Sequence, residues 1–221
     1  WNTVNKVRTP LKATDFSSYI APVLNSGADV LVLNHYGGNM VNSLTNAVQF
    51  GLRDKVVNNK NFEIIVPLYS RLMAKGAGAN VKGIFGSTNW HWSLQDEGSK
   101  AFVKSFGTKY GFPPSQAAHT VYCQTLLYAD ACNRAGTFNP CGVGEALEGF
   151  EFDGLGNGKT LYRADDHQCF KDVLVVKGKE NPTSEFDLLE IVEVTPMEQV
   201  QYAPDHPMFA GGDLGACNPG A

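Results

Sequence analysis

The chain has 221 residues, of which 43% are hydrophobic, and its 22 acidic and 18 basic residues give a formal net charge of −4. This length and apolar content are enough to bury a sizeable core in one large or two smaller domains, which excludes a disordered chain. The charges are scattered without a basic block, so nucleic acids and anionic membrane surfaces are poor candidate partners. No apolar run reaches the roughly 20 residues that a transmembrane helix needs, so we expect no direct membrane insertion.

The first 90 residues predict strands and helices in alternation. Thr14 and Asp15 are candidate N-caps for a helix that ends before Gly27. A second helical pattern follows the first strand. Continuous apolar strands separated by helices favour an α/β fold with a parallel sheet, covered by helices on both faces and joined by right-handed crossovers. The strands are expected at residues 29–34, 63–68 and 83–87.

After Trp92 the pattern changes to helices and a hairpin. Apolar residues at helical spacing predict one helix up to Tyr110, and Gly111-Phe112-Pro113-Pro114 ends it. The other expected elements are a long helix at residues 115–134, a short helix at 142–149, a hairpin at 150–163 with its turn at 154–158, strands at 173–177 and 188–194 joined by a connection at 178–184, and a tail rich in proline and glycine.

A loop of polar and aromatic residues follows the first predicted strand, and it is the first candidate for a ligand site. In open α/β sheets the groups that contact a ligand lie beyond the carboxyl ends of the strands. A similar loop follows the strand at residues 83–87, and aromatic faces beside hydrogen-bonding groups are typical of small-molecule clefts. Alternatively, Trp90 and Trp92 anchor a connection between domains. The candidate ligand-binding residues are Asn34, His35, Tyr36, Gly37, Asn39, Asn89 and Trp90, with one of Asn34 and His35 expected to point away.

Two motifs that suggest other chemistry are weak. Residues 154–160 end like a phosphate-binding loop, but Asp153 stands where that motif needs a glycine and a strand pattern follows, so a hairpin turn is favoured. His167 and Cys169 lie two residues apart and suggest a thiol nucleophile with a base. No oxyanion-hole signature accompanies them, so a structural or ligand-rim role is favoured over catalysis.

The five cysteines form no CxxC pair and no spacing typical of a zinc site, so neither a metal nor another cofactor is expected. Cys132 and Cys141 flank a turn and are either bridged or free; a bridge would fit an oxidising compartment. Cys123 lies in an apolar helical pattern and is expected to be a buried free thiol. A pairing of Cys169 with Cys217 stays open.

A series of short marks runs along the chain in a fixed order. They are Thr14 to Tyr19 before a helix, Ser26 to Val30 into a strand, Tyr36-Gly37-Gly38, Gly111-Phe112-Pro113-Pro114, Ala129-Asp130-Ala131, Ala146 to Phe150, and Asp166-His167-Gln168 before Val173 to Val176. Over residues 14–176 this set resembles the type I periplasmic binding proteins, the solute receptors of branched-chain amino acid type ABC transporters. The resemblance implies a Rossmann-like fold of two α/β lobes joined by three hinge strands.

The resemblance also implies that the chain is N-terminally incomplete. Trp1 is not an initiator methionine, and no counterpart of the opening βα units precedes it, so an incomplete first lobe is expected. The missing N-terminal lobe or a second fragment is then a partner. By resemblance, residues 1–93 form second-lobe α/β units, residues 94–152 the helices and strand that return to the first lobe, and residues 153–221 the recrossing strands and C-terminal tail.

The function implied by the resemblance is that of a non-enzymatic receptor in the periplasm or elsewhere outside the cytoplasm. It captures a small polar ligand, such as an amino acid, an amide or a related organic acid, for an ABC transporter permease. Tyr122, on the helix that returns to the first lobe, joins the ligand-binding candidates. Two alternatives stay open: a ligand-sensing regulator or receptor domain of the same fold, and a hydrolase that uses Cys169 and His167.

Overall fold

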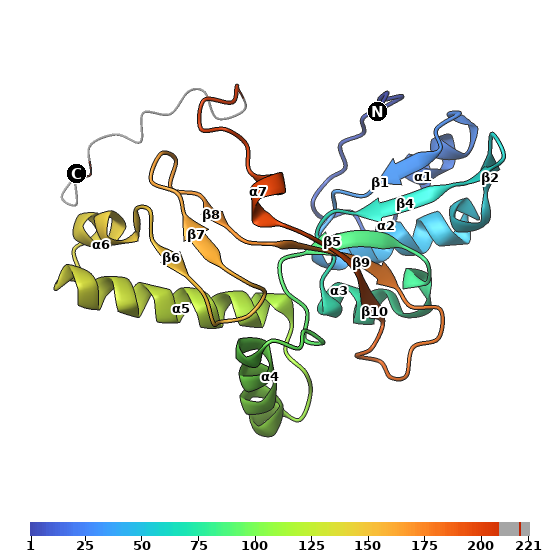
Figure 1. The fold of residues 1–221 in the computed structure, drawn as a ribbon. Coiled ribbons are helices and arrows are strands. Elements are labelled where there is room, and N and C mark those ends of the chain that lie inside the picture. The colour runs from blue at the N-terminus through green and yellow to red at the C-terminus, as the bar shows by residue number, and fades with distance from the viewer. Residues whose placement is uncertain (208–216, 218–221) are drawn as a thin grey trace. The chain divides into compact units, whose positions relative to one another are not determined.

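The computed structural model describes residues 1–207 and residue 217. The chain forms two compact units, and it passes from one to the other three times (Figure 1). None of the described helices has both the length and the apolar character needed to cross a membrane. Unit 1 comprises Trp1–Thr88 and Leu174–Glu193, and unit 2 comprises Asn89–Val173 and the described part of Val194–Ala221.

Unit 1 is built on a five-stranded sheet in the order β1-β4-β5-β9-β10 (Figure 1). β1, β4 and β5 are parallel, as predicted, whereas β9 runs antiparallel to β5 and makes the sheet mixed. Thr88 pairs with Leu174, so the chain leaves unit 1 at the end of β5 and returns beside that end, which forces β9 to run back. The strands are β1 (Val30–Val32), β4 (Glu63–Val66), β5 (Phe85–Thr88), β9 (Val173–Gly178) and β10 (Leu189–Thr195).

Helices flank this sheet, as predicted, but the crossover helices gather on one face rather than on both. α2 (Gly37–Gln49) connects β1 to β4, and α3 (Arg71–Ala77) connects β4 to β5. Both connections advance across the sheet in the same direction, so right-handed crossovers place both helices on the same face. Ile64 and Val66 are at most 2% exposed, whereas Val32, on the alternate face, is 37% exposed.

The N-terminal helix is shorter than its sequence pattern predicts. α1 (Ser17–Ile20) passes directly into the 3₁₀ helix η1 (Ala21–Asn25), in which Pro22 has no N–H to donate. Phe16 takes the N-cap position, and Asp15 Oδ1 accepts from Ser17 N–H at 2.8 Å. The remaining elements of unit 1 are η2 (Leu52–Asp54), β2 (Val56–Val57), β3 (Lys60–Asn61) and η3 (Gly78–Val81).

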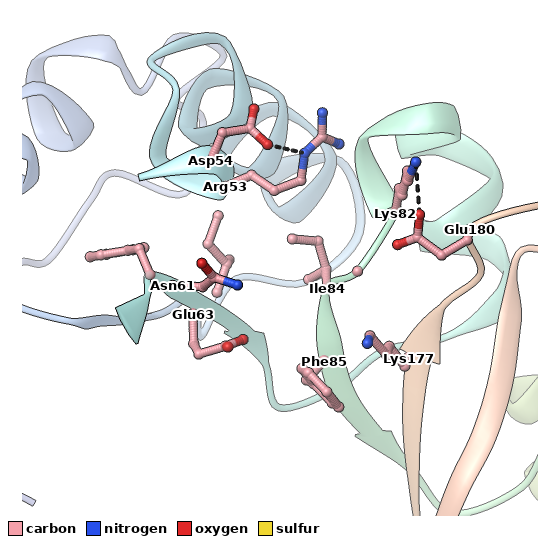
Figure 2. Close-up of a pocket in the computed structure, with 12 residues that line it drawn as sticks. Arg53, Asp54, Asn61, Glu63, Lys82, Ile84, Phe85, Lys177 and Glu180 are labelled. Atoms are coloured by element: carbon pink, nitrogen blue, oxygen red, sulfur yellow. Dashed lines mark ion pairs between the residues drawn. The ribbon is translucent and has the colours of Figure 1, made fainter. Parts of the chain in front are cut away.

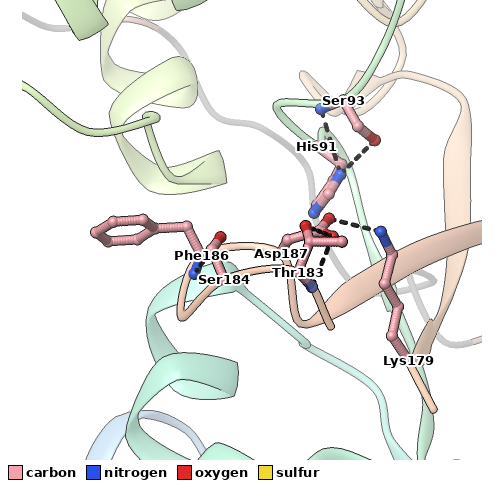
Figure 3. A network of polar contacts seen from close by, with 7 residues as sticks. All are labelled: His91, Ser93, Lys179, Thr183, Ser184, Phe186 and Asp187. Atoms are coloured by element: carbon pink, nitrogen blue, oxygen red, sulfur yellow. Dashed lines mark hydrogen bonds and ion pairs between the residues drawn. The ribbon is translucent and has the colours of Figure 1, made fainter. Parts of the chain in front are cut away.

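One carboxylate holds the connection between β9 and β10. Asp187 accepts hydrogen bonds from Lys179 Nζ at 2.5 Å and from Thr183 Oγ1 at 2.7 Å (Figure 3). Desolvation by burial raises the pKa of Asp187, but the hydrogen bonds from Lys179 and Thr183 outweigh it and leave the pKa below the usual aspartate value. The connection is therefore fixed by its own side chains.

Unit 2 contains the helices and the hairpin predicted for the second part of the chain. α4 (Glu97–Tyr110) is capped by Asp96 and α5 (Gln116–Ala135) by Ser115, and each helix ends at a glycine with a left-handed backbone. The predicted hairpin is confirmed, so residues 154–158 lie in its turn and Thr160 begins a strand, which rules out a phosphate-binding loop there. The other elements are α6 (Pro140–Leu147), the antiparallel strands β6 (Glu151–Phe152), β7 (Thr160–Tyr162) and β8 (Cys169–Phe170), and α7 (Met197–Val200).

The disulfide joins Cys141 to Cys217, whose Cα atoms are 5.5 Å apart. Both pairings considered from the sequence, Cys132 with Cys141 and Cys169 with Cys217, are therefore wrong. Cys132 is 5% exposed and packs in the apolar contact between α5 and α6, so its thiol lies in a core instead of at the turn. Cys123 is a buried free thiol, as predicted.

Candidate functional site

The first candidate loop lies beyond the carboxyl end of β1. Leu33 N–H donates to Ile65 O at 2.8 Å, and the backbone then leaves the sheet. α2 begins at Gly37, whose φ of +58° is a conformation that glycine adopts without strain. Tyr36, its N-cap residue, is 54% exposed. An aromatic ring is therefore exposed at the edge where open α/β sheets bind ligands.

The start of α2 is tied to neighbouring segments of unit 1. Gly37 N–H donates to Sδ of Met73 in α3 at 3.1 Å, and Asn39 Nδ2 donates to Leu11 O at 3.0 Å. Tyr36 makes no side-chain capping hydrogen bond, and the first turn of α2 holds no acidic residue. The N–H groups and the positive end of the helix dipole in this turn therefore favour a hydrogen-bond acceptor or an anion.

Of Asn34 and His35, the histidine is the one that faces the interior of unit 1. Its Nδ1 lies 2.8 Å from Ser43 Oγ, and its Nε2 lies 3.0 Å from Thr9 Oγ1. The imidazole also packs on Phe16, with 4.8 Å between ring centroids. Burial lowers the pKa of His35 and so favours the neutral ring. Asn34 is exposed.

Two leucines that sequence reasoning did not single out lie at the same edge of the sheet. Leu68 follows β4 and is 60% exposed, and Leu72, in the first turn of α3, is 52% exposed. The hydrogen bond between Gly37 and Met73 brings this turn next to the start of α2. Their position after a second parallel strand is the sequence signal that indicates them.

Trp90 occupies the core of unit 2. It is 1% exposed, its indole N–H donates to Ser99 Oγ at 2.9 Å, and its ring stacks on His119 with 4.3 Å between centroids. Phe102 packs edge-on against Trp90 and stacks on Tyr122 with 4.6 Å between centroids. This burial agrees with the alternative interpretation of the second loop, in which the tryptophan is an anchor.

Asn89 and Tyr122 lie nearer the surface of unit 2. Asn89 Nδ2 donates to Thr120 Oγ1 at 3.3 Å, and the Asn89 carbonyl accepts from Asn157 Nδ2 at 2.7 Å. Tyr122 is 36% exposed. Trp90 and Tyr122 both pack on Phe102, and Asn89 bonds to Thr120 of α5, the helix that carries Tyr122. The residues from Asn34 to Asn39 share one loop of unit 1.

His119 is a buried, neutral imidazole beneath these residues. It is 1% exposed, and its Nε2 donates to Leu155 O at 2.7 Å. Desolvation by burial lowers the pKa of His119 to about 4, although the hydrogen bond to the Leu155 carbonyl raises it. The ring therefore carries one proton at neutral pH, on Nε2.

A charged hollow of about 340 Å³ lies at the opposite edge of the sheet, by the amino-terminal ends of β4 and β5 (Figure 2). Arg53 Nε lies 3.8 Å from Asp54, and Lys82 Nζ lies 2.7 Å from Glu180. Because ligand sites of such sheets lie at the carboxyl ends, this hollow is not the candidate site. Among the described residues no cluster of His, Cys, Asp and Glu is arranged to hold a metal ion.

A family model described as "Periplasmic binding protein" matches residues 2–183. The chain belongs to the periplasmic binding protein family. The resemblance inferred from the sequence is thereby confirmed. No curated protein matched the chain.

Solved structures of periplasmic binding proteins share this fold, and the chain spans about half of their length. A branched-chain amino acid ABC transporter periplasmic ligand-binding protein from Burkholderia xenovorans is 27% identical, with a TM-score of 0.72 over 89% of this chain and 51% of that one. A periplasmic binding protein from Burkholderia mallei is 26% identical, with a TM-score of 0.75 over 87% and 50%. A solute binding protein of an ABC transporter from Rhodopseudomonas palustris, in complex with p-hydroxybenzoic acid, shares the fold at 17% identity and a TM-score of 0.74 over 88% and 52%.

The periplasmic binding protein family is non-enzymatic, so the prediction that this chain is not an enzyme is confirmed. His167, considered as a base for the hydrolase alternative, is an exposed residue. Its Nε2 lies 2.9 Å from Glu148 Oε1, and its backbone has a φ of +56° in an exposed turn. The imidazole thus takes part in a polar contact at the surface.

Proposed function

We propose that this chain is a ligand-recognising part of a solute-binding receptor for an ABC transporter, acting outside the cytoplasm. Membership of the periplasmic binding protein family supports ligand capture. The disulfide between Cys141 and Cys217 supports an oxidising, extracytoplasmic location. The partner that receives the ligand is the transporter's permease.

The observation that carries the proposal is the exposed ring of Tyr36 at the start of α2. It stands beyond the carboxyl end of a parallel strand, next to helix N–H groups that favour an acceptor. Asn34, Gly37 and Asn39 supply polar groups in the same loop. Leu68 adds apolar surface at the same edge. Such a wall suits a ligand with an apolar or aromatic body and a carboxylate or amide group.

Amino acids, amides and related organic acids are the ligand classes that combine these features. One similar structure is that of a branched-chain amino acid ABC transporter periplasmic ligand-binding protein, and another is a complex with p-hydroxybenzoic acid, which supports this range. In unit 2 we assign Asn89 and Tyr122 as a second group of contacts. We assign Trp90, which is 1% exposed, to the core of unit 2 and not to the ligand contacts.

The other half of the family's fold is the second proposed partner. Val121 and Tyr128 on α5 are 67% and 52% exposed, and the uncovered face of the sheet of unit 1 includes Val32. Exposed apolar surface of this kind marks an interface. We assign residues 1–93 to the second lobe, residues 94–152 to elements that return to the first lobe, and residues 153–221 to the recrossing strands and tail. The remaining lobe, in the same polypeptide or a second fragment, then covers these exposed apolar surfaces.

The proposal is tested by ligand-dependent stabilisation of the full chain. For a ligand at ten times its dissociation constant, binding adds RT ln(1 + [L]/Kd), about 1.4 kcal/mol, which raises Tm by about 3 °C for a chain of this size. Leucine, acetamide and p-hydroxybenzoate are the probes. The Tyr36→Ala variant should lose the shift.

Tyr110→Ala is the matched control, because Tyr110 is 50% exposed and belongs to unit 2 and not to the loop. Its ligand-dependent shift should equal that of the original chain. A shift that survives Tyr36→Ala would contradict the assignment of the loop. Absence of a shift with every amino acid, amide and carboxylate tried would contradict ligand capture by this chain.

A further inference from the structure

Two free thiols and a lysine line one cavity of unit 2. The cavity has a volume of about 380 Å³ and is bounded by α5, by β7 and β8, and by Val200 of α7. Its wall includes Cys123 from α5, Cys169 from β8 and Lys171, which follows β8. Neither thiol belongs to the disulfide or is assigned to the ligand contacts. Asn89, which we do assign to those contacts, also lines this cavity.

A chain of polar contacts directs Cys169 toward the helical turn that carries Cys123. Cys169 pairs with Tyr162 across β7 and β8, and the Tyr162 hydroxyl donates to Gln124 Oε1 at 2.6 Å. Both Tyr162 and Gln124 are within hydrogen-bonding reach of the Cys169 thiol. Gln124 is the residue after Cys123 in α5, so the two thiols face one cavity from neighbouring positions.

The two cysteines differ in accessibility. Cys123 is 7% exposed, and its Sγ lies 3.4 Å from His119 Nε2. Cys169 is an exposed residue, although surrounding atoms desolvate its thiol. Cys169 is therefore the more exposed of the two cysteine residues, and we expect a reagent from solvent to react there first.

Burial and charge set the reactivity of both thiols. Burial raises the pKa of Cys123 and of Cys169, while the ammonium of Lys171 acts in the opposite direction on each. Lys171 Nζ donates to Gly156 O at 2.8 Å, which holds it at the cavity wall. Both groups are therefore mainly thiols at neutral pH, and their reactive thiolate fractions grow as the pH rises.

We propose that Cys169 is a site of thiol–disulfide exchange with small disulfides that carry a carboxylate, and that Cys123 resolves the product into a second disulfide between α5 and β8. The carboxylate arm of the reagent pairs with Lys171. The cavity has room for that arm, since small-molecule pockets begin at roughly 300 Å³.

The exchange has two balanced steps. The Cys169 thiolate attacks one sulfur of the reagent RSSR, the reagent's S–S bond breaks, a Cys169–S–S–R bond forms, and RS⁻ leaves and takes up a proton. The Cys123 thiolate then attacks Sγ of Cys169, forms the bond between the two cysteines and expels the second RS⁻. Overall, two protein thiols are oxidised and one small disulfide is reduced to two thiols. Closure requires the Cα atoms to come within about 7 Å, so the product also reports the approach of α5 to β8.

The test compares two reagents on the full chain with its existing disulfide intact. Dithiodipropionate carries carboxylate arms and cystamine carries ammonium arms. Intact mass spectrometry with peptide mapping should show a loss of two hydrogens and a peptide that joins Cys123 to Cys169. We expect the reaction to be about tenfold faster with dithiodipropionate, because a like-charged reagent is repelled by Lys171. The rate should rise about tenfold per pH unit while the pH is below the thiol pKa.

Variants separate the roles of the groups. Cys132→Ser, which removes the third free thiol, should leave the product unchanged, and Cys169→Ser should abolish it. Cys123→Ser should stop the reaction at a mixed disulfide on Cys169. Lys171→Met should remove the preference for the carboxylate reagent. Because the reagent comparison uses the unaltered chain, it decides the point even if a variant does not fold.

Three results would overturn the proposal. In the first, neither reagent modifies Cys169 of the folded chain. In the second, the mixed disulfide on Cys169 persists in the unaltered chain, so that Cys123 does not resolve it. In the third, cystamine reacts as fast as dithiodipropionate, which would remove Lys171 from the recognition of the reagent.

Discussion

Replacement of His119 should remove a large part of the acid sensitivity of this protein. His119 is 1% exposed, stacks on Trp90 and donates to Leu155 O. Burial lowers its pKa from an ordinary value of 6.5 to about 4. The unfolded chain therefore takes up a proton at His119 at a higher pH than the folded chain does. The stability that depends on the neutral ring is complete above pH 6.5 and is lost as the pH falls toward 4.

The size of the effect follows from the two pKa values. Each pKa unit corresponds to about 1.4 kcal/mol, so the free energy of unfolding should fall by about 2.5 kcal/mol between pH 7 and pH 4.5 because of His119 alone. His119→Phe keeps an aromatic ring against Trp90 but cannot titrate. Its stability at pH 7 should drop by about 1 to 3 kcal/mol, because the Leu155 carbonyl loses its donor.

The assay is urea unfolding of both chains at pH 7 and pH 4.5, followed by circular dichroism. The His119→Phe variant should lose about 2.5 kcal/mol less over this pH range than the original chain. His206→Phe, which removes a histidine outside the core, should keep the full loss. If His119→Phe and the original chain lost equal stability on acidification, the buried neutral histidine would not be the cause and the reasoning would fail.

Three further substitutions test the packing and the cross-links. Gly178→Ala should lower the free energy of unfolding by about 3 kcal/mol or more, because an added Cβ would lie 1.7 Å from Val81 O. Gly144→Ala is the control and should leave the stability nearly unchanged, because nothing lies within 4 Å of a Cβ there. Equal urea midpoints of the two variants would contradict this prediction. Cys141→Ser removes the disulfide between residues 76 positions apart and should lower the free energy of unfolding by up to about 4.5 kcal/mol. The measurement is urea unfolding without reductant. An unchanged urea midpoint would count against the disulfide. Asp187→Asn should lower the free energy of unfolding by about 1 to 3 kcal/mol at pH 7. Because the pKa of Asp187 in the folded chain lies below the ordinary 3.8, this difference between the variant and the original chain should shrink only as the pH falls below 3.8. A difference that disappears at higher pH would contradict a charged Asp187 that accepts from Lys179.

Local features of the fold were predictable from the sequence because short-range chemistry determines them. Ser115 caps α5 where the helical pattern begins, and Gly111 ends α4 with a φ of +77°. The hairpin around residues 154–158 likewise depends on turn residues alone. The N-terminal helix was predicted too long, because Pro22 tightens the second half of that segment into a 3₁₀ helix.

Features set by distant parts of the chain were not predictable. The antiparallel direction of β9 depends on the passage through unit 2 between β5 and β9. The disulfide joins residues 76 positions apart, so the nearer Cys132 was the natural candidate for Cys141 until the packing of α5 on α6 was known. No local pattern distinguishes these outcomes.

The candidate site also combines features that the local sequence determines with features that depend on distant residues. The position of Tyr36 beyond a parallel strand follows from the strand pattern and from Gly37, which begins the helix. The burial of Trp90 does not follow from the sequence, because a tryptophan after a strand has the same neighbours in the sequence whether its ring faces a ligand or a core. Ser99 and His119, which bond to it and stack on it, lie in two later helices.

We assign the binding of a small solute to the loop at the start of α2. The most direct measurement is a titration of the ¹⁵N-labelled full chain with p-hydroxybenzoate, leucine and acetamide, followed by ¹H–¹⁵N NMR. We expect saturable shifts of the backbone amides of Gly37, Gly38 and Asn39 with at least one of these ligands, and the loss of these shifts in Tyr36→Ala. Shifts confined to the charged hollow around Lys82 and Glu180, or no saturable shift at Gly37, would contradict it.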